Sequence, residues 1–390
     1  MILTSKKDCR YVIIRIKPYH FEINPLGDGG DKREAQIDEA LTSAGFNIKD
    51  INVSTIGFQY SRWDKIRLFV KYYTNLSDIR REFSRSYGYF RPFREQLRIS
   101  YYYDHIKHLP FIGESKTLLW SNTYPFLWFI PYLFKYKFGY RVLALPHNIE
   151  SLVPGQTKDY FSKKNERWLY EELRYLSACD KVYCIALEDE WLLKLTNSNA
   201  EFLSYFPVKT LQLDLLKIRE RRKYNTRNHK EEIPSFLIMG SATNSPTYIG
   251  MKEILVFLAQ NKAILDTCKF CIAGFGTEIL KDFLVHKNAE FLGTVDNQKL
   301  EDLLVTCKAA IINQAASTGA LTKIQEYLLA GVPIIMNHFS ARSYHSREGI
   351  KIFRSLEELP GLLAEPAEIA APVIIDPCIK LIQDIRKLIA

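Results

Sequence analysis

The stretch Ala309–Met336, AAIINQAASTGALTKIQEYLLAGVPIIM, decides the fold of this chain. It opens with four apolar residues, 309–312, a run typical of a strand that is buried on both faces. Residues 313–319 are small and polar and would not fill a core. Apolar side chains then recur with helical spacing from Leu321 to Ala330, and Gly331 can adopt the left-handed conformation that ends a helix. A second apolar run follows, so the stretch predicts a strand–loop–helix–strand unit.

The start of the helix in this unit has features of a phosphate site. A loop of small residues that leads into a helix offers backbone amides and the positive end of the helix dipole. Lys323 and Glu326 lie three residues apart and therefore share a face of the helix. A cation suits a diphosphate, and a carboxylate suits ribose hydroxyls. The pattern favours a nucleotide-sugar site, and the alternative is an ordinary crossover helix with a solvated lysine and glutamate.

The pattern Gly319-x-x-x-Lys323-x-x-Glu326, followed by Leu-Ala-Gly-Val-Pro at 329–333, resembles the donor-site signature of GT-B glycosyltransferases, particularly those of family 4. The resemblance implies that Glu326 binds the ribose and that Lys323 and the loop around Thr318 and Gly319 meet the phosphates. Many family members carry a second glutamate eight residues before the first. Thr318 stands at that position here, which is a departure from the family pattern.

The composition is that of a globular protein with an anionic partner. The 390 residues suffice for two domains, with 47% hydrophobic and 25% charged residues. A net charge of +9 favours a nucleotide, a phospholipid surface or nucleic acid as partner. The seven cysteines are scattered and odd in number, as in reduced, cytosolic proteins. The isolated C-x-x-C at 268–271 has no partner pair, which disfavours a zinc or redox role.

Two segments bear on targeting and membranes. The N-terminal sequence MILTSKKDCRYVIIRIK has no long apolar core, so we do not expect a signal peptide. The most apolar segment, 117–138, is interrupted by Asn122, Pro125 and Pro131 and contains no window of about 18 uninterrupted apolar residues. It therefore predicts a strand and a buried helix, the latter over 126–134, rather than a membrane span.

The first strand, Tyr11–Ile16, precedes a glycine-rich loop at 24–33 and a helix that Gly45 ends. This is again an anion-binding arrangement, although it lacks a G-x-G-x-x-G fingerprint and so supports nicotinamide binding only weakly. It resembles the Gly-Gly loop after the first strand of GT-B enzymes. The resemblance implies that Gly29 and Gly30 lie in the cleft between the domains, near the donor phosphate and the acceptor. The alternative is a plain turn.

The strand 141–145 ends in Pro-His-Asn-Ile-Glu-Ser. Ligands of open α/β sheets bind at the carboxyl ends of strands, where His147 lies. The segment resembles the H-N-x-E sequence of family 4, which implies that His147 reaches the donor sugar as a catalytic residue and that Asn148 and Glu150 line the acceptor side. The alternative is a capped or core histidine.

Cations and aromatic residues alternate over Ser61–Tyr103. Three interpretations stay open: two solvated amphipathic helices, a surface that binds anionic lipid headgroups, and a platform for single-stranded nucleic acid. The third is disfavoured because no nucleic-acid-binding motif accompanies the charge, so we expect no nucleic acid partner. The lipid interpretation assigns membrane contact to arginines of this segment, namely Arg80, Arg81, Arg85, Arg91 and Arg94.

The strand 235–239 leads into a loop where family members place an arginine and a lysine to hold the diphosphate. Here Ser241 stands near the arginine position, and Tyr-Ile-Gly at 248–250 replaces the usual Lys-Gly. Phosphate binding must then rely on loop amides, hydroxyls and Lys323. The resemblance also implies that the loop at Gly293 and Thr294 contacts the nucleotide base through its backbone.

We therefore predict an α/β protein with two Rossmann-like β/α/β domains facing a cleft, the GT-B fold, with parallel sheets. An acceptor domain would span residues 1–206, a connector 207–234, and a donor domain 235–390 whose last helix can pack back on the first domain. The resemblance implies a glycosyltransferase that moves a sugar from a nucleotide sugar to a glycan, lipid-linked glycan or similar acceptor with retention.

The same resemblance implies no metal and no cofactor, with the nucleotide sugar serving as substrate, and no DxD-type metal motif is evident. We expect a cytoplasmic protein that is peripheral on the inner face of the membrane. Two alternatives remain: another GT-B chemistry such as a nucleotide-sugar epimerase, and a non-catalytic protein that binds nucleotide sugars or glycans.

Overall fold

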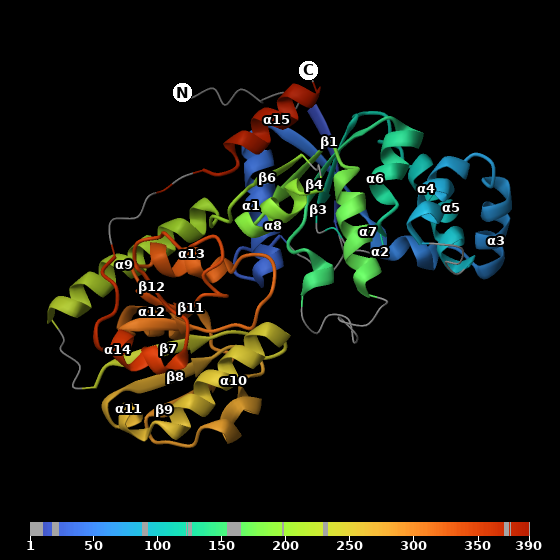
Figure 1. The fold of residues 1–390 in the computed structure, drawn as a ribbon. Helices are drawn as coiled ribbons and strands as arrows, with labels where there is room; N and C mark the ends of the chain where they lie inside the picture. The colour runs from blue at the N-terminus through green and yellow to red at the C-terminus, as the bar shows by residue number, and fades with distance from the viewer. Residues whose placement is uncertain are drawn as a thin grey trace, which may run out of the picture. The chain divides into compact units, whose positions relative to one another are not determined.

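The computed structural model describes residues 11–17, 23–87, 93–121, 123, 127–153, 165–196, 199–228, 233–369, 374 and 376–389. Side chains at 54, 83–87, 93–95, 165–167 and 226–228 lie outside this description. The described residues divide into two compact units, each built on one sheet (Figure 1). The first unit comprises those of 1–152, 159–204 and 376–390, and the second unit comprises essentially those of 205–375.

The first unit contains a parallel sheet of six strands in the order β2-β1-β3-β4-β5-β6. The central strand β3 is buried along its whole length and β4 is buried after the exposed Arg141, as the continuous apolar runs predict. The strands are β1 (Tyr11–Lys17), β2 (Phe46–Asn52), β3 (Thr117–Ser121), β4 (Arg141–Leu145), β5 (Lys181–Cys184) and β6 (Ala200–Phe202).

Helices cover both faces of this sheet, and one apolar core lies on each face. The α-helices are α1 (Gly29–Ser43), α2 (Val53–Ile56), α3 (Arg62–Lys71), α4 (Ser77–Tyr87), α5 (Phe93–Lys107), α6 (Ile130–Leu133), α7 (Asn165–Ser177), α8 (Leu187–Lys194) and α15 (Ile379–Ile389). The 3₁₀ helices η1 (Gly57–Gln59) and η4 (Glu150–Leu152) and the π-helix η3 (Phe134–Phe138) complete the unit.

The helix expected over 126–134 differs in its bounds. Helix α6 begins at Ile130 because Pro131, whose ring fixes φ and lacks an amide hydrogen, favours the first turn of a helix. It then runs on as the π-helix η3 to Gly139, whose φ of 68° ends it. Residues 122 and 124–126 of the predicted helix and its approach lie outside the described part of the chain.

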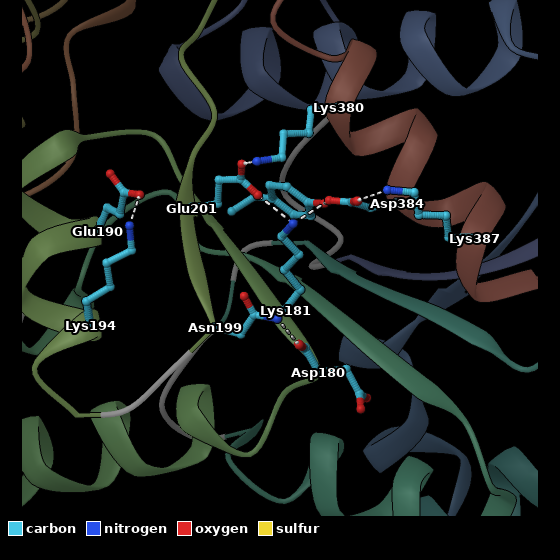
Figure 2. A network of polar contacts seen from close by, with 10 residues as sticks. Asp180, Lys181, Glu190, Lys194, Asn199, Glu201, Lys380, Asp384 and Lys387 are labelled. Atoms are coloured by element: carbon cyan, nitrogen blue, oxygen red, sulfur yellow. Dashed lines mark hydrogen bonds and ion pairs between the residues drawn. The ribbon is translucent and has the colours of Figure 1, made fainter.

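The last helix, α15, belongs to the first unit although it follows the second in sequence. Leu381 and Ile385 are fully buried against the core on the α1 side of the sheet. A polar network fastens the same helix to strands β5 and β6 (Figure 2). Lys181 of β5 forms ion pairs with Glu201 of β6 at 2.5 Å and with Asp384 of α15, which also accepts a 2.6 Å hydrogen bond from the Tyr183 hydroxyl.

The second unit has its own parallel sheet of six strands, in the order β12-β11-β10-β7-β8-β9. The strands are β7 (Ser235–Met239), β8 (Lys269–Ala273), β9 (Ala289–Gly293), β10 (Ala309–Ile312), β11 (Ile334–Asn337) and β12 (Ile350–Phe353). The α-helices are α9 (Lys209–Asn228), α10 (Ser245–Gln260), α11 (Lys262–Thr267), α12 (Asn297–Thr306), α13 (Thr322–Leu329) and α14 (Leu359–Ala364), with 3₁₀ helices η5 (Thr277–Phe283) and η6 (Leu356–Glu358).

The segment 207–234, expected to be a connector too charged to join a core, forms helix α9 of the second unit and packs on α12 and α13. Leu215 is buried, and so are Arg219 and Arg222. The Arg219 guanidinium donates to the Leu328 carbonyl at 2.9 Å, and that of Arg222 donates to the Gly331 carbonyl at 2.9 Å. Both carbonyls lie at or just beyond the end of α13, where acceptors lack the i+4 amide partners of a helix interior, although the Leu328 carbonyl also accepts from the Gly331 amide at 3.2 Å. These acceptors stabilise the two buried arginines.

Candidate functional site

The order of strands in the second sheet marks one edge as a ligand site. Strands β7, β8 and β9 follow one another in one direction, whereas β10, β11 and β12 run in the other direction from β7. The chain direction across the sheet therefore reverses between β7 and β10. In open α/β sheets, ligands bind outside the carboxyl ends of the strands at such a point. The loops after β7 and β10 contain Ser241, Thr318 and Gly319 and lead into α10 and α13.

The side chain of Lys323 connects the two strands at this reversal point. It belongs to the first turn of α13, which follows β10, and its ammonium group donates to the carbonyl of Met239, the last residue of β7. A Cβ atom on Gly240 would lie 3.4 Å from the Lys323 Nζ atom. The structure therefore holds a cation at the carboxyl ends of two adjacent strands.

The N-terminus of α13 has no side-chain cap. Its N-cap residue is Leu321, which has no hydrogen-bonding side chain, and the first turn contains no acidic residue. Gly319 precedes it with a φ of 76°, a conformation that other residues rarely adopt. No carboxylate of the first turn itself therefore neutralises the positive end of the helix dipole, which suits an anion.

Glu326 lies one turn beyond Lys323 on α13 and is 9% exposed. Its Oε1 atom accepts a 3.0 Å hydrogen bond from the hydroxyl of Tyr205, a residue of the same unit that is 2% exposed. The hydrogen bond fixes one carboxylate oxygen. Tyr205 was not identified from sequence, because it lies 121 positions away from Glu326 and in no motif.

Buried amides brace the loop between β10 and α13. Gln314 donates through its side chain to Thr247 of α10 at 2.8 Å and receives a 2.8 Å hydrogen bond from Asn337 at the end of β11. Asn313 donates to the Gly250 carbonyl of α10 at 3.0 Å. A Cβ atom on Gly250 would lie only 2.0 Å from the Asn313 carbonyl oxygen, so glycine is required for this approach. The loop is therefore fixed from two sides.

The other predicted donor residues occupy neighbouring loops at the same edge. The Ser241 hydroxyl is hydrogen-bonded to that of Thr243 at 2.7 Å and is half-buried. Gly293, with a φ of 62°, accepts a 2.7 Å hydrogen bond from the Gly274 amide, and Thr294 beside it is exposed. The loops after β7, β8 and β9 thus lie in sequence along the edge, with Ser241 and Thr294 in reach of solvent.

In the first unit, His147 contacts a carboxylate that the sequence did not reveal. Its Nε2 atom lies 3.3 Å from Oε1 of Glu34, a residue of α1 that is 1% exposed. Arg15 of β1 lies behind Glu34 at 4.0 Å and pairs with Asp38 and Asp50 at 3.0 and 2.7 Å. Burial alone would raise the pKa of Glu34, but the contact with His147 and the charge of Arg15 lower it below its usual value.

The loop after His147 is held by another buried carboxylate. Both oxygens of Glu172 in α7 accept backbone amides, from Glu150 at 2.8 Å and from Ser151 at 2.7 Å. Asn148 donates to Glu150 at 3.2 Å, so the three predicted residues of this loop lie together. Burial raises the pKa of Glu172 to about 8, and the nearby Glu150 charge adds to the shift against the two amide hydrogen bonds.

Gly29 and Gly30 form the start of α1 rather than an open loop. The Asp28 carboxylate accepts from the amides of Gly30 at 2.8 Å and Asp31 at 3.0 Å, and Asp31 in turn accepts from the Asp28 amide. This is a capping box. The arrangement that was expected to bind an anion is therefore occupied by two carboxylates of its own, although the two glycines stay candidates for the acceptor loop.

The basic and aromatic segment 61–103 is divided between core and surface. Tyr72 and Tyr101 to Tyr103 are buried in the core, and Arg80, 8% exposed, donates to the Tyr73 carbonyl and to Ser100. The assignment of membrane contact to Arg80 is wrong, because its side chain packs within the fold. Arg81 is exposed, whereas the side chains of Arg85, Arg91 and Arg94 lie outside the described residues.

One face of α3 remains exposed. Trp63 is 78% exposed and Val70 is 69% exposed, with the exposed Arg67 between them at helical spacing. Arg62 and Lys71 are also exposed, and Phe58 lies in the preceding η1 with 91% exposure. We call these six residues the α3 face. No helix among the described residues is long and apolar enough to cross a membrane.

Two parallel six-stranded sheets of this order, covered by helices, match the GT-B fold. No protein-family model and no curated protein sequence matches the chain. Solved structures do. A sucrose-phosphate synthase from Thermosynechococcus elongatus is similar with a TM-score of 0.59 and 12% identity, over 91% of this chain and 90% of its own.

Two further similar structures are a glycosyltransferase and a complex with a nucleotide sugar. WaaG, described as a glycosyltransferase involved in lipopolysaccharide biosynthesis, has a TM-score of 0.52 and 11% identity over 90% of this chain and 89% of its own. An E. coli trehalose-6-phosphate structure, described as bound with UDP-2-fluoro glucose, has a TM-score of 0.55 and 12% identity over 97% and 96%. At these identities the similarity defines the fold.

Proposed function

We propose that the protein is a glycosyltransferase that uses a nucleotide-sugar donor. The observation that carries this proposal is the position of Lys323 and Glu326 on one helix at the reversal point of the second sheet. The cation bridges two strand ends, and the carboxylate is fixed by Tyr205. The E. coli structure with UDP-2-fluoro glucose, which has the same fold, supports a nucleotide sugar as ligand.

The donor would lie along the carboxyl edge of the second sheet. Lys323, the loop at Thr318 and Gly319, and the Ser241 hydroxyl would bind the diphosphate. Glu326 would accept hydrogen bonds from the ribose, and the backbone at Gly293 and Thr294 would contact the base. These assignments are supported by the uncapped start of α13 and by the bracing of its loop, which holds the amides in place before a ligand binds.

In the chemical step, positive charge at the diphosphate would stabilise the departing group, and no metal would be required. His147 would act at the donor sugar, and transfer would retain the anomeric configuration. Glu34 would keep the His147 ring in one orientation, because the two side chains are in contact and Glu34 is itself fixed near Arg15. His147→Ala should therefore lower turnover more than donor affinity. A fully active variant would make His147 structural.

The acceptor would be a glycan or a lipid-linked glycan, bound by the first unit near Gly29, Gly30, Asn148 and Glu150. The capped start of α1 supports this, since Asp28 and Asp31 would repel a phosphate but tolerate hydroxyl groups. WaaG, which is described as involved in lipopolysaccharide biosynthesis, supports an acceptor of this class.

The enzyme would meet such an acceptor at the cytoplasmic face of a membrane, through the α3 face. Arginine and lysine are attracted to anionic headgroups by about 1 kcal/mol each near the surface. Tryptophan and phenylalanine suit the interface layer. The exposure of Trp63 and Phe58 beside Arg62, Arg67 and Lys71 supports this assignment.

The donor proposal is tested by a thermal-shift screen of nucleotide sugars, followed by incubation of each stabilising donor with and without glycan acceptors. A glycosyltransferase releases nucleoside diphosphate and joins the sugar to an acceptor. Isomerisation of the sugar without an acceptor would indicate an epimerase, and affinity without turnover would indicate a binding protein. If no nucleotide sugar raises the melting temperature of the protein, the proposed donor site is refuted.

The membrane proposal is tested by cosedimentation with anionic liposomes across a salt series. The variant Trp63→Ser, Arg67→Ser, Lys71→Ser should pellet less than the natural protein, and the natural protein should pellet less as salt rises. Trp191→Ser is the matched control, because Trp191 is an exposed tryptophan of α8 in the same unit, with 65% exposure. If the α3 variant and the natural protein pellet equally, the α3 face does not bind the membrane and is an ordinary solvated surface.

A further inference from the structure

The loop after β11 is joined to the loop before α13 by one arginine. The Arg342 side chain donates through Nε to the Gly319 carbonyl at 3.0 Å and through Nη2 to the Thr318 carbonyl at 3.4 Å. Its Nη1 atom donates to the Phe339 carbonyl of its own loop at 2.6 Å. A planar guanidinium can make such divergent contacts because its donors point along fixed directions. Arg342 thus ties two loops of the same sheet edge together.

The backbone around Arg342 is held tightly. Asn337 at the end of β11 accepts hydrogen bonds from the amide and the hydroxyl of Ser340, at 3.0 and 2.6 Å. Ser343 has a φ of 63° and is the one non-glycine residue with positive φ among the residues that the structure describes. Strained conformations of this kind persist where the surrounding structure fixes them, and they concentrate at ligand sites. The loop therefore presents Arg342 in a defined position.

This arginine occupies a place where positive charge is needed. A diphosphate carries more negative charge than Lys323 alone balances, and the loop after β7 contributes the neutral Ser241. The Arg342 guanidinium is always charged and lies in contact with Thr318 and Gly319, whose loop leads into α13. No sequence motif marks it, since it comes from a different loop than the donor signature.

We propose that Arg342 is a positioning residue of the donor site, which fixes the Thr318–Gly319 loop and adds a second positive charge beside Lys323. The inference rests on the proposed donor site at this edge of the sheet. It extends that site to the loop after β11, and it makes inorganic pyrophosphate, the charged part common to nucleoside diphosphates, a ligand whose affinity depends on Arg342.

The test is calorimetric titration with pyrophosphate at low and moderate salt. Arg342→Gln, which removes the charge and keeps hydrogen-bond donors, should weaken binding about tenfold or more, as loss of one charged interaction does. It should also make the affinity less dependent on salt. Arg342→Lys keeps the charge and should retain more affinity than Arg342→Gln. Arg347→Gln is the matched control, an exposed arginine of the same loop that should leave affinity unchanged.

The outcomes separate this inference from the proposed function. Binding of pyrophosphate by the natural protein with equal affinity in Arg342→Gln would overturn the inference and leave the donor site standing. If Arg342→Lys and Arg342→Gln lose the same amount of pyrophosphate affinity, the charge of Arg342 does not contribute to binding. If the natural protein binds neither pyrophosphate nor any nucleotide sugar, the donor site and the inference both fail. Circular dichroism of each variant verifies folding. If Arg342→Gln does not fold, the affinity of Arg342→Lys for pyrophosphate is compared with that of the natural protein. It should be lower, because lysine cannot make both contacts of Arg342 with the Thr318 and Gly319 carbonyls.

Discussion

Helices α1 and α13 both follow a strand and a loop that contains glycine, yet their N-termini differ in what they leave for a ligand. Helix α1 is closed by a capping box of Asp28 and Asp31. Helix α13 begins at Leu321 without a side-chain cap and carries Lys323 in its first turn. The same backbone pattern therefore gives a neutralised helix end in one unit and an electropositive one in the other. Side chains at the cap decide whether a helix N-terminus can receive a phosphate.

The largest effect should come from the brace that holds the α13 loop. Gly250→Ala would place a Cβ atom 2.0 Å from the Asn313 carbonyl oxygen and force α10 and the loop apart. We expect a loss of about 3 kcal/mol of stability, at the upper end of the range for overpacking, together with loss of donor binding. Urea unfolding and pyrophosphate titration measure the two effects.

Gly361→Ala is the control for this substitution. Gly361 is also helical and lies in the same unit, but no atom lies within 4 Å of the added Cβ. Alanine there should be neutral or stabilise by up to about 1 kcal/mol. If both alanine variants unfold at the same urea concentration as the natural protein, the close approach at Gly250 does not support the loop.

The second prediction addresses the charged groups of α13. Glu326→Ala and Lys323→Met should each weaken nucleotide-sugar binding by about 1.5–3 kcal/mol, the range for hydrogen bonds to charged groups. Lys323→Met should weaken pyrophosphate binding as well, whereas Glu326→Ala should affect the ligand only when it carries a ribose. Titrations with pyrophosphate and with the donor distinguish the two roles. Unchanged donor affinity in a folded Glu326→Ala protein would remove the ribose assignment.

The third prediction concerns pH and the carboxylates that hold the His147 loop. The folded pKa of Glu172 is raised to about 8 from an ordinary value of 4.5, mainly by burial, and burial also raises that of Glu171 to about 9. The folded protein thus binds more protons than the unfolded chain between about pH 4.5 and 8. The free energy of unfolding should therefore fall as pH rises through this window, by at most about 1.4 kcal/mol per pH unit for each carboxyl.

Glu172→Gln removes one of these contributions and should flatten the slope, while the contribution of Glu171 remains. The titratable groups near Glu172 include Glu150 and Tyr175, the latter on the same helix as Glu172. Neither residue is a cation that could stabilise the ionised form of Glu172. Unfolding at several pH values measures the slope. Identical slopes for the variant and the natural protein would mean that Glu172 is not buried as a proton-binding group.

The smallest effects should come from exchanging the two caps. Asp28→Ala should cost about 1 kcal/mol of stability, as loss of an N-cap does, without changing pyrophosphate affinity. Leu321→Asp copies the acidic cap onto α13 and should weaken pyrophosphate binding by about 1 kcal/mol, since a carboxylate then neutralises the helix end. If pyrophosphate affinity changes in Asp28→Ala but not in Leu321→Asp, the anion binds near the N-terminus of α1 and not near that of α13.

The sequence predicted the second sheet closely. Strands β7 and β10 have the predicted bounds, because apolar runs bounded by polar residues or glycine allow few other interpretations. The burial of helix α9 was not expected from the sequence, because Arg219 and Arg222 look like surface residues. Only the packed structure shows that carbonyls at the end of α13 need their hydrogen bonds.

The site divides in the same way. Lys323 and His147 are placed by local patterns at strand ends, so the sequence could indicate them. Their partners Tyr205, Glu34 and Arg342 come from other elements and belong to no motif. A side chain that acts through a contact distant in sequence leaves no periodic signal, which is why folding had to reveal these partners.

The membership of α15 in the first unit has a consequence for biosynthesis. The ribosome completes strand β6 long before it makes the helix that covers Leu381 and Ile385 and pairs Asp384 with Lys181. At about 5–20 residues per second, the wait is roughly 10 to 35 s. During that interval the nascent first unit exposes an apolar patch, and Lys181 has Glu201 but not Asp384 as its carboxylate partner, so the unit depends on chaperone cover or rapid release more than the second unit does.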